Sequence, residues 1–178
     1  LPNITTLLRR NLDLYKDKIV YQEKNSDGDY EGINWSDFVN NIENIAFNLH
    51  QRGFKKGEKM VLFSRNRLDM LQLELAVMAY GGVAVPIFAN FKRDTAELLI
   101  NHSDSTWLAV AGEKQLENIE DIPKIKEIFV FDEVDREFYN NTTPFKELLK
   151  ERAVDQSFLD EDITPETICL NMYTSGTM

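Results

Sequence analysis

The sequence predicts an α/β fold: a largely parallel sheet with helices on both faces, preceded by a β-hairpin. Short apolar runs alternate with runs of helical length, and such strand–helix–strand units form right-handed crossovers between parallel strands. The short runs are apolar throughout, as expected for strands that are covered on both faces. An Asp-Gly pair between two β-rich runs near the N-terminus indicates the hairpin.

The N-terminal part is predicted to form one helix and the hairpin. A helix is expected within residues 1–17 because its apolar side chains recur at helical spacing: Ile4, Leu7, Leu8, Leu12 and Tyr15. Two β-rich runs flank Asn-Ser-Asp-Gly-Asp, so the hairpin is expected over residues 18–35. Asp27 and Asp29 resemble half of a calcium loop, but no glutamate follows at the required spacing, which favours a plain turn.

Residues 36–173 are predicted to form the α/β sheet region. Ser36 is the expected N-cap of its first helix, over residues 37–53, and Gly53 is the expected stop. The apolar residues of this helix form one stripe: Phe38, Ile42, Ile45 and Leu49.

A second helix is expected over residues 66–82. Asn66 is the expected cap, with Asp69 completing an arrangement like a capping box, and two glycines end the helix. Its inward-facing residues are expected to be Leu68, Leu71, Leu75 and Met78.

The remaining elements alternate along the chain. Strands are predicted at residues 59–64, 83–88, 106–112, 126–132 and 167–173, and helices at residues 94–103, 113–119 and 144–151. In open parallel sheets, ligands bind at the carboxyl ends of the strands. Residues 174–178, Thr-Ser-Gly-Thr-Met, follow the last predicted strand at that edge.

The stretch Thr-Ser-Gly-Thr fits two interpretations. Small residues let backbone N–H groups converge on an anion, and the hydroxyls add donors. The stretch lacks the lysine and the second glycine of a P-loop, however. On its own, it therefore indicates either a phosphate-binding loop or a polar turn.

Composition limits the classes of function. The 178 residues are 43% hydrophobic, enough for the core of one domain, and no run reaches the length of a membrane span. The net charge of −10 disfavours nucleic acid as a partner. Cys169 is the single cysteine, which excludes an internal disulfide, and it is interpreted as a buried core residue. A cytoplasmic location is expected, because no secretory signal is recognised.

The two histidines, and two arginines near the N-terminus, also bear on possible binding roles. His50 and His102 lack companions at metal-ligand spacing, so a metal site is not expected, and His102 is interpreted as a surface helix end. Arg9 and Arg10 beside an apolar helix face suggest a membrane-surface helix, but nearby aspartates favour packing on the protein itself.

Tyr-Thr-Ser-Gly-Thr at residues 173–177 resembles the start of the signature of the adenylate-forming (AMP-binding) enzymes, which continues as T-G-x-P-K-G. Residues 33–88 resemble the family at the same relative distances. They contain a helix ending in a G-hydrophobic-x-x-G pattern, an Asn-Arg pair after the next strand, and a strand entrance of the form G-G-V-x-V-P. Residues 89–110 align with the family's following helix and strand without a gap.

The late runs at residues 122–133 and 144–149 look specifically like long-chain fatty acid–CoA ligases. The resemblance covers the chain from about residue 5 and implies the N-terminal subdomain of an acyl-CoA synthetase-like fold. It further implies an enzyme that activates a fatty acid with ATP and Mg²⁺ to an acyl-adenylate and transfers the acyl group to coenzyme A.

The resemblance also assigns binding residues. It places the ATP phosphates on Thr174, Ser175, Gly176 and Thr177, with Thr174 also contacting Mg²⁺, and it assigns no catalytic residue to this chain. Small and hydroxylated residues suit this role, because converging donors stabilise the departing pyrophosphate.

The chain departs from the family pattern at a few positions. Met178 stands where a second threonine is usual, and Lys92 where a Ser or Thr helix cap is common. Leu68 and Met70 replace the usual Pro and Trp. The family's lysine, its later acidic residues and its C-terminal domain are not in this sequence. Residues 1–178 are therefore expected to be a truncated subdomain, inactive alone, whose partner is the C-terminal portion of the same chain.

Two alternatives stay open at this point. One is an adenylate-forming ligase for another carboxylate, such as an aryl, medium-chain or amino acid. The other is a non-catalytic flavodoxin-like binding module, which the parallel-sheet pattern alone would allow. The sequence also leaves open peripheral membrane association and a homodimer.

Overall fold

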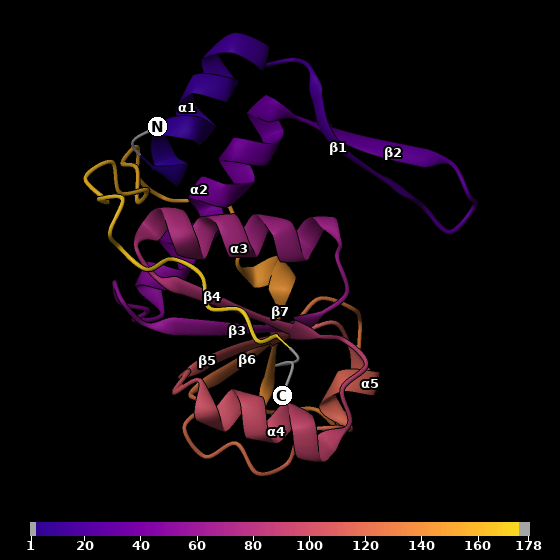
Figure 1. The fold of residues 1–178 in the computed structure, drawn as a ribbon. Coiled ribbons are helices and arrows are strands. Elements are labelled where there is room, and N and C mark those ends of the chain that lie inside the picture. The colour runs from indigo at the N-terminus through magenta and orange to yellow at the C-terminus, as the bar shows by residue number, and fades with distance from the viewer. Residues whose placement is uncertain (1–2, 175–178) are drawn as a thin grey trace.

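The computed structural model describes residues 3–174 and contains a five-stranded parallel sheet and a separate antiparallel hairpin (Figure 1). The sheet has the order β4-β3-β5-β6-β7, and its strands are β3 (Lys59–Ser64), β4 (Val83–Phe88), β5 (Trp107–Val110), β6 (Glu127–Val130) and β7 (Thr142–Pro144). The hairpin pairs β1 (Ile19–Lys24) with β2 (Tyr30–Asn34). The helices are α1 (Ile4–Tyr15), α2 (Trp35–Gln51), α3 (Leu68–Tyr80), α4 (Arg93–His102) and α5 (Glu113–Leu116). The predicted fold class is confirmed.

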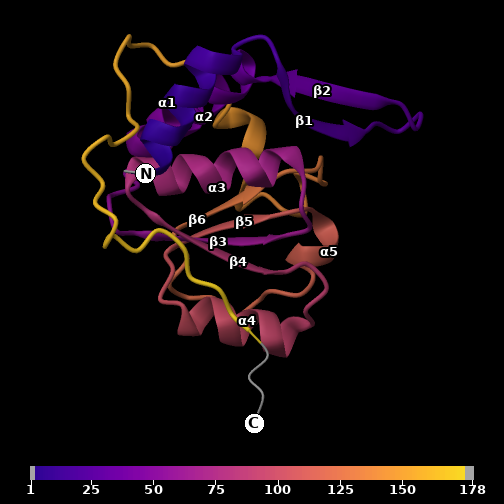
Figure 2. The ribbon, with the colours of Figure 1, turned by 45° about the horizontal axis from the view of Figure 1, so that its top comes forward.

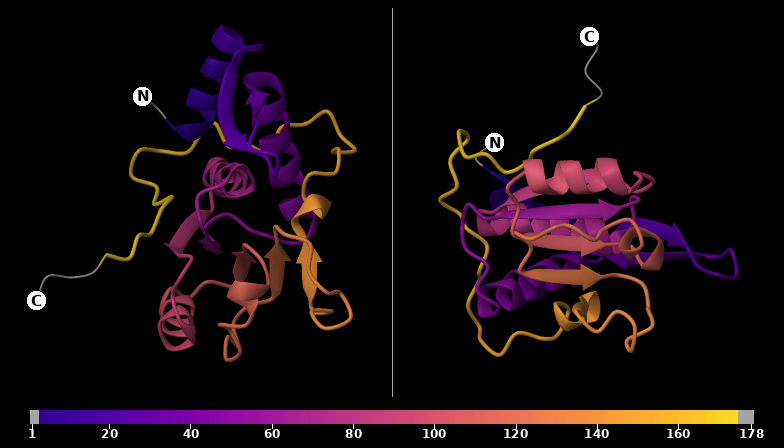
Figure 3. Two further views of the ribbon diagram at one scale, coloured as in Figure 1. Left: turned by 90° about the vertical axis from the view of Figure 1, so that its right-hand side faces the viewer. Right: turned by 90° about the horizontal axis from the view of Figure 1, so that it is seen from below.

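Helices cover the sheet in layers. α3 lies directly on one face, with α1 and α2 stacked above it, and α4 lies on the opposite face (Figures 1 and 2). Alternate residues of β3 reach the two faces, because side chains of a strand point to opposite sides. Met60 and Leu62 join the upper apolar cluster, and Val61 and Phe63 join the lower one. The view from below in Figure 3 shows the strands running in the same direction beneath α4.

The N-terminal predictions hold. Asn3 caps α1, with its side chain accepting a hydrogen bond from the backbone of Thr6. In the turn between β1 and β2, the Asn25 side chain accepts from the backbone N–H groups of Asp27 and Asp29, so this segment is a turn. The guanidinium of Arg9 forms ion pairs with Glu43 and Glu161, so this side of α1 packs on the protein itself.

The predicted cap of α2 is wrong. The N-cap is Asn34, whose side-chain oxygen accepts from the Asp37 backbone N–H at 2.8 Å, and Ser36 already lies inside the helix. The reason is that β2 runs directly into α2, so the last strand residue caps the helix. The predicted stripe is confirmed, since each of its four side chains is at most 1% exposed: Phe38, Ile42, Ile45 and Leu49.

The predicted cap of α3 is also wrong. The N-cap position is Arg67, whose side chain makes no capping bond, and Asn66 lies outside the helix. Asp69 does not complete a capping box, because its carboxylate accepts from the Arg67 guanidinium at 2.9 Å. The backbone N–H of Leu68 instead donates a hydrogen bond to the carboxylate of Glu23 on β1, at 3.2 Å. A partner from the hairpin thus replaces a local cap.

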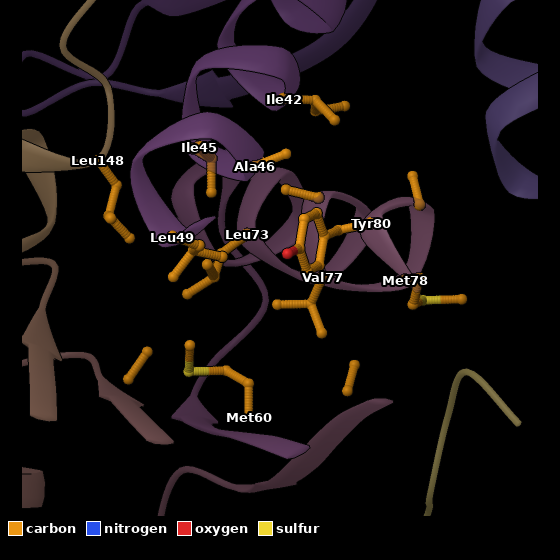
Figure 4. Close-up of a cluster of buried hydrophobic side chains, with 14 of the residues drawn as sticks. Ile42, Ile45, Ala46, Leu49, Met60, Leu73, Val77, Met78, Tyr80 and Leu148 are labelled. Carbon is orange, nitrogen blue, oxygen red and sulfur yellow. The ribbon is translucent and has the colours of Figure 1, made fainter. Parts of the chain in front are cut away.

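Burial around α3 differs in part from the prediction. Met78 is buried as expected, but three of the predicted inward residues are only half-buried: Leu68, Leu71 and Leu75. The fully buried side chains include Leu73 and Val77, which Figure 4 shows in one apolar layer with residues of α2 and with Met60 of β3. Because α3 lies between the sheet and two other helices, it is apolar around most of its surface, and a single stripe does not describe it.

The last third departs most from the prediction. The helix expected at residues 144–151 is a single 3₁₀ turn, η1 (Phe145–Glu147), which follows directly on β7, a strand that the sequence did not predict. The helix expected at residues 113–119 is the short α5. The strand expected at residues 167–173 is reduced to one bridge between Leu170 and Ala84. Cys169 is half-buried, and not buried as predicted.

No helix within residues 3–174 is both long and apolar enough to cross a bilayer.

Candidate functional site

The C-terminal segment runs along the outer edge of β4. The Ala84 N–H donates to the Cys169 carbonyl and the Asn171 N–H donates to the Ala84 carbonyl, both at 2.9 Å. The bridge is parallel, so the segment advances in the same direction as β4, as Figure 1 shows in yellow. It therefore approaches the edge at which the parallel strands end, where ligands bind in such sheets.

A cavity of about 410 Å³ lies at that edge. Its walls are the carboxyl-terminal parts of β3 and β4, the loops that follow them, the first turn of α3 and the C-terminal segment: Ser64, Arg65, Asn66, Met70, Pro86, Ile87, Phe88, Ala89, Asn90, Met172 and Tyr173. None of these described residues carries a carboxylate, whereas Arg65 contributes a guanidinium. In a chain of net charge −10, a cavity lined in this way suits an anionic ligand.

Arg65 is the cation of this cavity. It follows directly on β3, it is exposed, and it forms no ion pair within residues 3–174. Sequence reasoning did not single it out. The preceding strand is apolar in its centre but ends in Ser64, and no local pattern marks the arginine that follows it.

Thr174 is the predicted site residue that the structure describes. It is exposed and immediately follows Tyr173 of the cavity wall. Ser175, Gly176 and Thr177, which were also assigned to the ATP phosphates, lie outside the described residues, as does Met178. Their phosphate-binding role stays a prediction.

Tyr173 attaches the segment to α4. Its hydroxyl lies 2.9 Å from Nδ1 of His102 and 3.4 Å from the Leu99 carbonyl oxygen. Burial raises the pKa of Tyr173, and the negative charge of Asp104 raises it further, so the phenol stays protonated at neutral pH. His102 is the exposed last residue of α4, as the sequence predicted.

A second polar cluster ties the loops at the same edge. Arg67, after β3, donates to Asp132, after β6, at 2.6 Å and to Asp69 at 2.9 Å. Burial disfavours the charged guanidinium, but the hydrogen bond to Asp132 and the charge of Asp69 outweigh it, and the pKa of Arg67 is raised. Burial raises the pKa of Asp69, against the lowering effect of Arg67. The guanidinium of Arg67 is thus engaged by two carboxylates of the same chain.

A sequence model of the family described as "AMP-binding enzyme" matches residues 8–178. The chain belongs to the AMP-binding enzyme family. The match includes the Tyr-Thr-Ser-Gly-Thr stretch that follows the Ala84–Leu170 bridge. The fold described above is therefore the N-terminal portion of the adenylate-forming fold.

Curated relatives of this AMP-binding enzyme chain act on different carboxylates. The chain is 30% identical to fatty acyl-CoA synthetase A of Dictyostelium discoideum over 158 residues, which cover 84% of this chain and 24% of that protein. It is 36% identical to 4-hydroxybutyrate–CoA ligase 2 of Metallosphaera sedula over 107 residues, covering 58% of this chain and 18% of that one. The chain thus spans about a quarter or less of the length of these relatives.

Solved structures share the fold of this AMP-binding enzyme chain. Coronafacic acid ligase from Pectobacterium brasiliense superposes with a TM-score of 0.81 at 20% identity, covering 96% of this chain and 33% of that one. A long-chain-fatty-acid–CoA ligase from Archaeoglobus fulgidus gives a TM-score of 0.76 at 20% identity, covering 99% and 35%. At these identities the likeness concerns the fold alone.

Proposed function

We propose that the protein containing this chain is an AMP-forming acid–thiol ligase that activates a long-chain fatty acid and transfers it to coenzyme A. The single observation that carries the proposal is the parallel bridge between Ala84 and Leu170. It supports the proposal because the chain reaches the cavity at the carboxyl edge with Tyr173, the first residue of the Tyr-Thr-Ser-Gly-Thr stretch that the AMP-binding enzyme model matches.

The proposed reaction has two steps. A carboxylate oxygen attacks the α-phosphorus of ATP, the bond to the pyrophosphate oxygen breaks, and an acyl-adenylate forms. The thiolate of coenzyme A then attacks the acyl carbon, and AMP leaves. In the first step, backbone N–H groups and hydroxyls of residues 174–177 stabilise the charge that develops on the departing pyrophosphate. Arg65, at the same edge, adds positive charge to the approach of the nucleotide.

The residues present fit a magnesium ion that arrives with the nucleotide. Within residues 3–174, no group of three His, Cys, Asp or Glu side chains is arranged to hold a metal ion alone. Mg²⁺ commonly binds through substrate phosphates and few protein oxygens, and the hydroxyl of the exposed Thr174 is such an oxygen. Bound there, the ion would neutralise part of the triphosphate charge.

The fatty acid is the preferred substrate class because the relatives named as fatty acyl-CoA synthetases match the larger share of this chain. A second candidate is a ligase for a short or aromatic carboxylate. It is favoured by the higher identity to 4-hydroxybutyrate–CoA ligase 2, and a structural neighbour is an anthranilate–CoA ligase in complex with anthranoyl-AMP.

The test is ATP–pyrophosphate exchange by the full-length protein. Palmitate, 4-hydroxybutyrate, anthranilate and an amino acid are supplied in parallel, and palmitate is expected to give the fastest exchange. A fastest rate with one of the other acids selects the second candidate. No exchange with any of the four contradicts the ligase proposal and leaves the family and the fold.

A further inference from the structure

Backbone pairing to β4 ends before the C-terminal segment reaches Thr174. Ala84 uses both of its backbone groups on Cys169 and Asn171. The next residue of β4 that faces the same edge is Pro86, because strand residues alternate in direction. Proline has no N–H to donate, so the Asn171 carbonyl finds no donor on Pro86. Within residues 3–174 the Pro86 carbonyl accepts no backbone hydrogen bond from the segment either. Between Asn171 and Thr174 the chain is therefore held by contacts other than backbone pairing to β4.

Tyr173 supplies such a contact through its side chain. Met172 is 68% exposed, whereas Tyr173 is half-buried and packs against the lower apolar cluster. Its ring meets the His102 ring edge-on, with centroids 5.8 Å apart. Its hydroxyl reaches two groups of α4, Nδ1 of His102 at 2.9 Å and the Leu99 carbonyl at 3.4 Å. Tyr173 is thus the last anchor before the predicted phosphate loop.

The tautomer of His102 sets the direction of the shorter hydrogen bond. With a proton on Nδ1, His102 donates to the phenol oxygen and the phenol donates to the Leu99 carbonyl; with Nδ1 unprotonated, the phenol donates to Nδ1. In either tautomer the Nδ1–hydroxyl contact joins Tyr173 to the end of α4. An amide side chain, which carries both a donor and an acceptor, can replace either form.

We propose that His102 and Tyr173 are positioning residues that hold the start of the phosphate loop against α4 before ATP binds. This inference rests on the proposed function. With the anchor in place, Thr174 is already located when the nucleotide arrives. Without it, binding must also order this part of the chain, which weakens binding and leaves the chemistry of the bound complex unchanged.

Three substitutions in the full-length protein test the anchor. Y173F keeps the ring and removes both hydrogen bonds, and H102A removes the imidazole partner. H102N restores a hydrogen-bonding group close to the position of Nδ1. From the usual effect of one lost hydrogen bond, KM for ATP in palmitate-dependent exchange should rise about three- to ten-fold in Y173F and H102A, with kcat changed by less than about two-fold. H102N should stay near the wild type.

A matched control exists on the opposite face of the sheet. Nδ1 of His50 lies 3.0 Å from the Tyr80 hydroxyl, which in turn donates to a backbone carbonyl, that of Phe54. The pair has the same chemistry but lies among α2 and α3, with the His50 ring beside Phe158 and with no hydrogen bond to residues 169–174. H50A should therefore leave KM for ATP unchanged.

A second readout needs no nucleotide. Amide hydrogen exchange of a peptide containing residues 171–174 is measured in the unliganded full-length protein, and it should be faster in Y173F and H102A than in the wild type, H102N or H50A. If exchange and KM are both unchanged, or if kcat falls at constant KM, the positioning role is wrong. If the wild type shows no ATP–pyrophosphate exchange, the proposed function fails, while the amide exchange still decides whether the anchor exists.

Discussion

Gly82 lies at the junction of α3 and β4, where the chain passes close to a buried ring. A Cβ at this position would lie 2.7 Å from the ring of Phe54 and 3.1 Å from Val77. Phe54 is only 1% exposed and has no room to move. Close packing of this kind admits no side chain without displacing the core.

We therefore expect Gly82→Ala to lower the free energy of unfolding by about 1–3 kcal/mol, the usual effect of overpacking. The matched control is Gly112→Ala. Its Cβ would lie 2.8 Å from the carboxylate of Asp132, a side chain that is half exposed and can turn away. Urea unfolding should show the larger loss for Gly82→Ala, and equal losses would contradict the packing argument.

At the scale of elements, α2 begins where β2 ends, and one residue serves both. Asn34 pairs with Ile19 in the hairpin and also caps α2 through Asp37. Asn34→Ala should lower the free energy of unfolding by about 1 kcal/mol, because the first turn of the helix loses its side-chain acceptor. Ser36→Ala, which alters the residue that the sequence favoured as the cap, should have almost no effect. Thermal or urea unfolding of the two variants decides between the two caps.

Periodicity in the sequence was enough to place α1 to α4 and β1 to β6, because each of these elements is long or strongly patterned. It could not place β7, which has three residues and ends in a proline. It also placed a strand at residues 167–173, where the structure has one bridge to β4 and Pro86 offers no N–H for a further bond after Asn171. The cap of α3 was misplaced because Leu68 finds its partner through a tertiary contact, the carboxylate of Glu23. The cap of α2 was misplaced because β2 runs directly into the helix, which makes Asn34 the cap.

The sequence could predict the part of the candidate site that follows from strand direction, but not the part formed by contacts between distant residues. The carboxyl-edge rule placed residues 174–178 near the ligand-binding edge, since strand direction follows from the alternation of helices and strands. The pairs Arg67–Asp132 and His102–Tyr173 join residues 65 and 71 positions apart, and nothing local in the sequence connects them. Arg65 carries no local pattern either, and the cavity that it lines forms only when β3 and β4 align.

On the scale of the whole molecule, apolar side chains are exposed beside β4. Phe88 is 63% exposed and lines the carboxyl-edge cavity together with Met172, and Ile168 is 66% exposed two positions before Leu170. Exposed apolar groups of this kind favour association with other surfaces. The chain of residues 1–178 on its own should therefore self-associate.

Size-exclusion chromatography over a range of concentrations measures this expectation. Replacing Ile168 and Met172 by serine should shift the chain toward a monomer. Replacing Phe138, which is 75% exposed in the segment after β6, should change the elution less. A wild-type chain that elutes as a monomer at every concentration would contradict this expectation.

The proline on the outer side of β4 has a mechanical consequence. As far as Thr174, where the described residues end, the C-terminal segment shares with the sheet the two backbone hydrogen bonds of Ala84, so this part can separate from β4 while the ladder between β3 and β4 stays intact. In the proposed enzyme, each turnover requires the predicted phosphate loop to bind a nucleotide and later to release pyrophosphate. Because Pro86 offers no further N–H to the segment, the segment can move while β4 stays paired with β3.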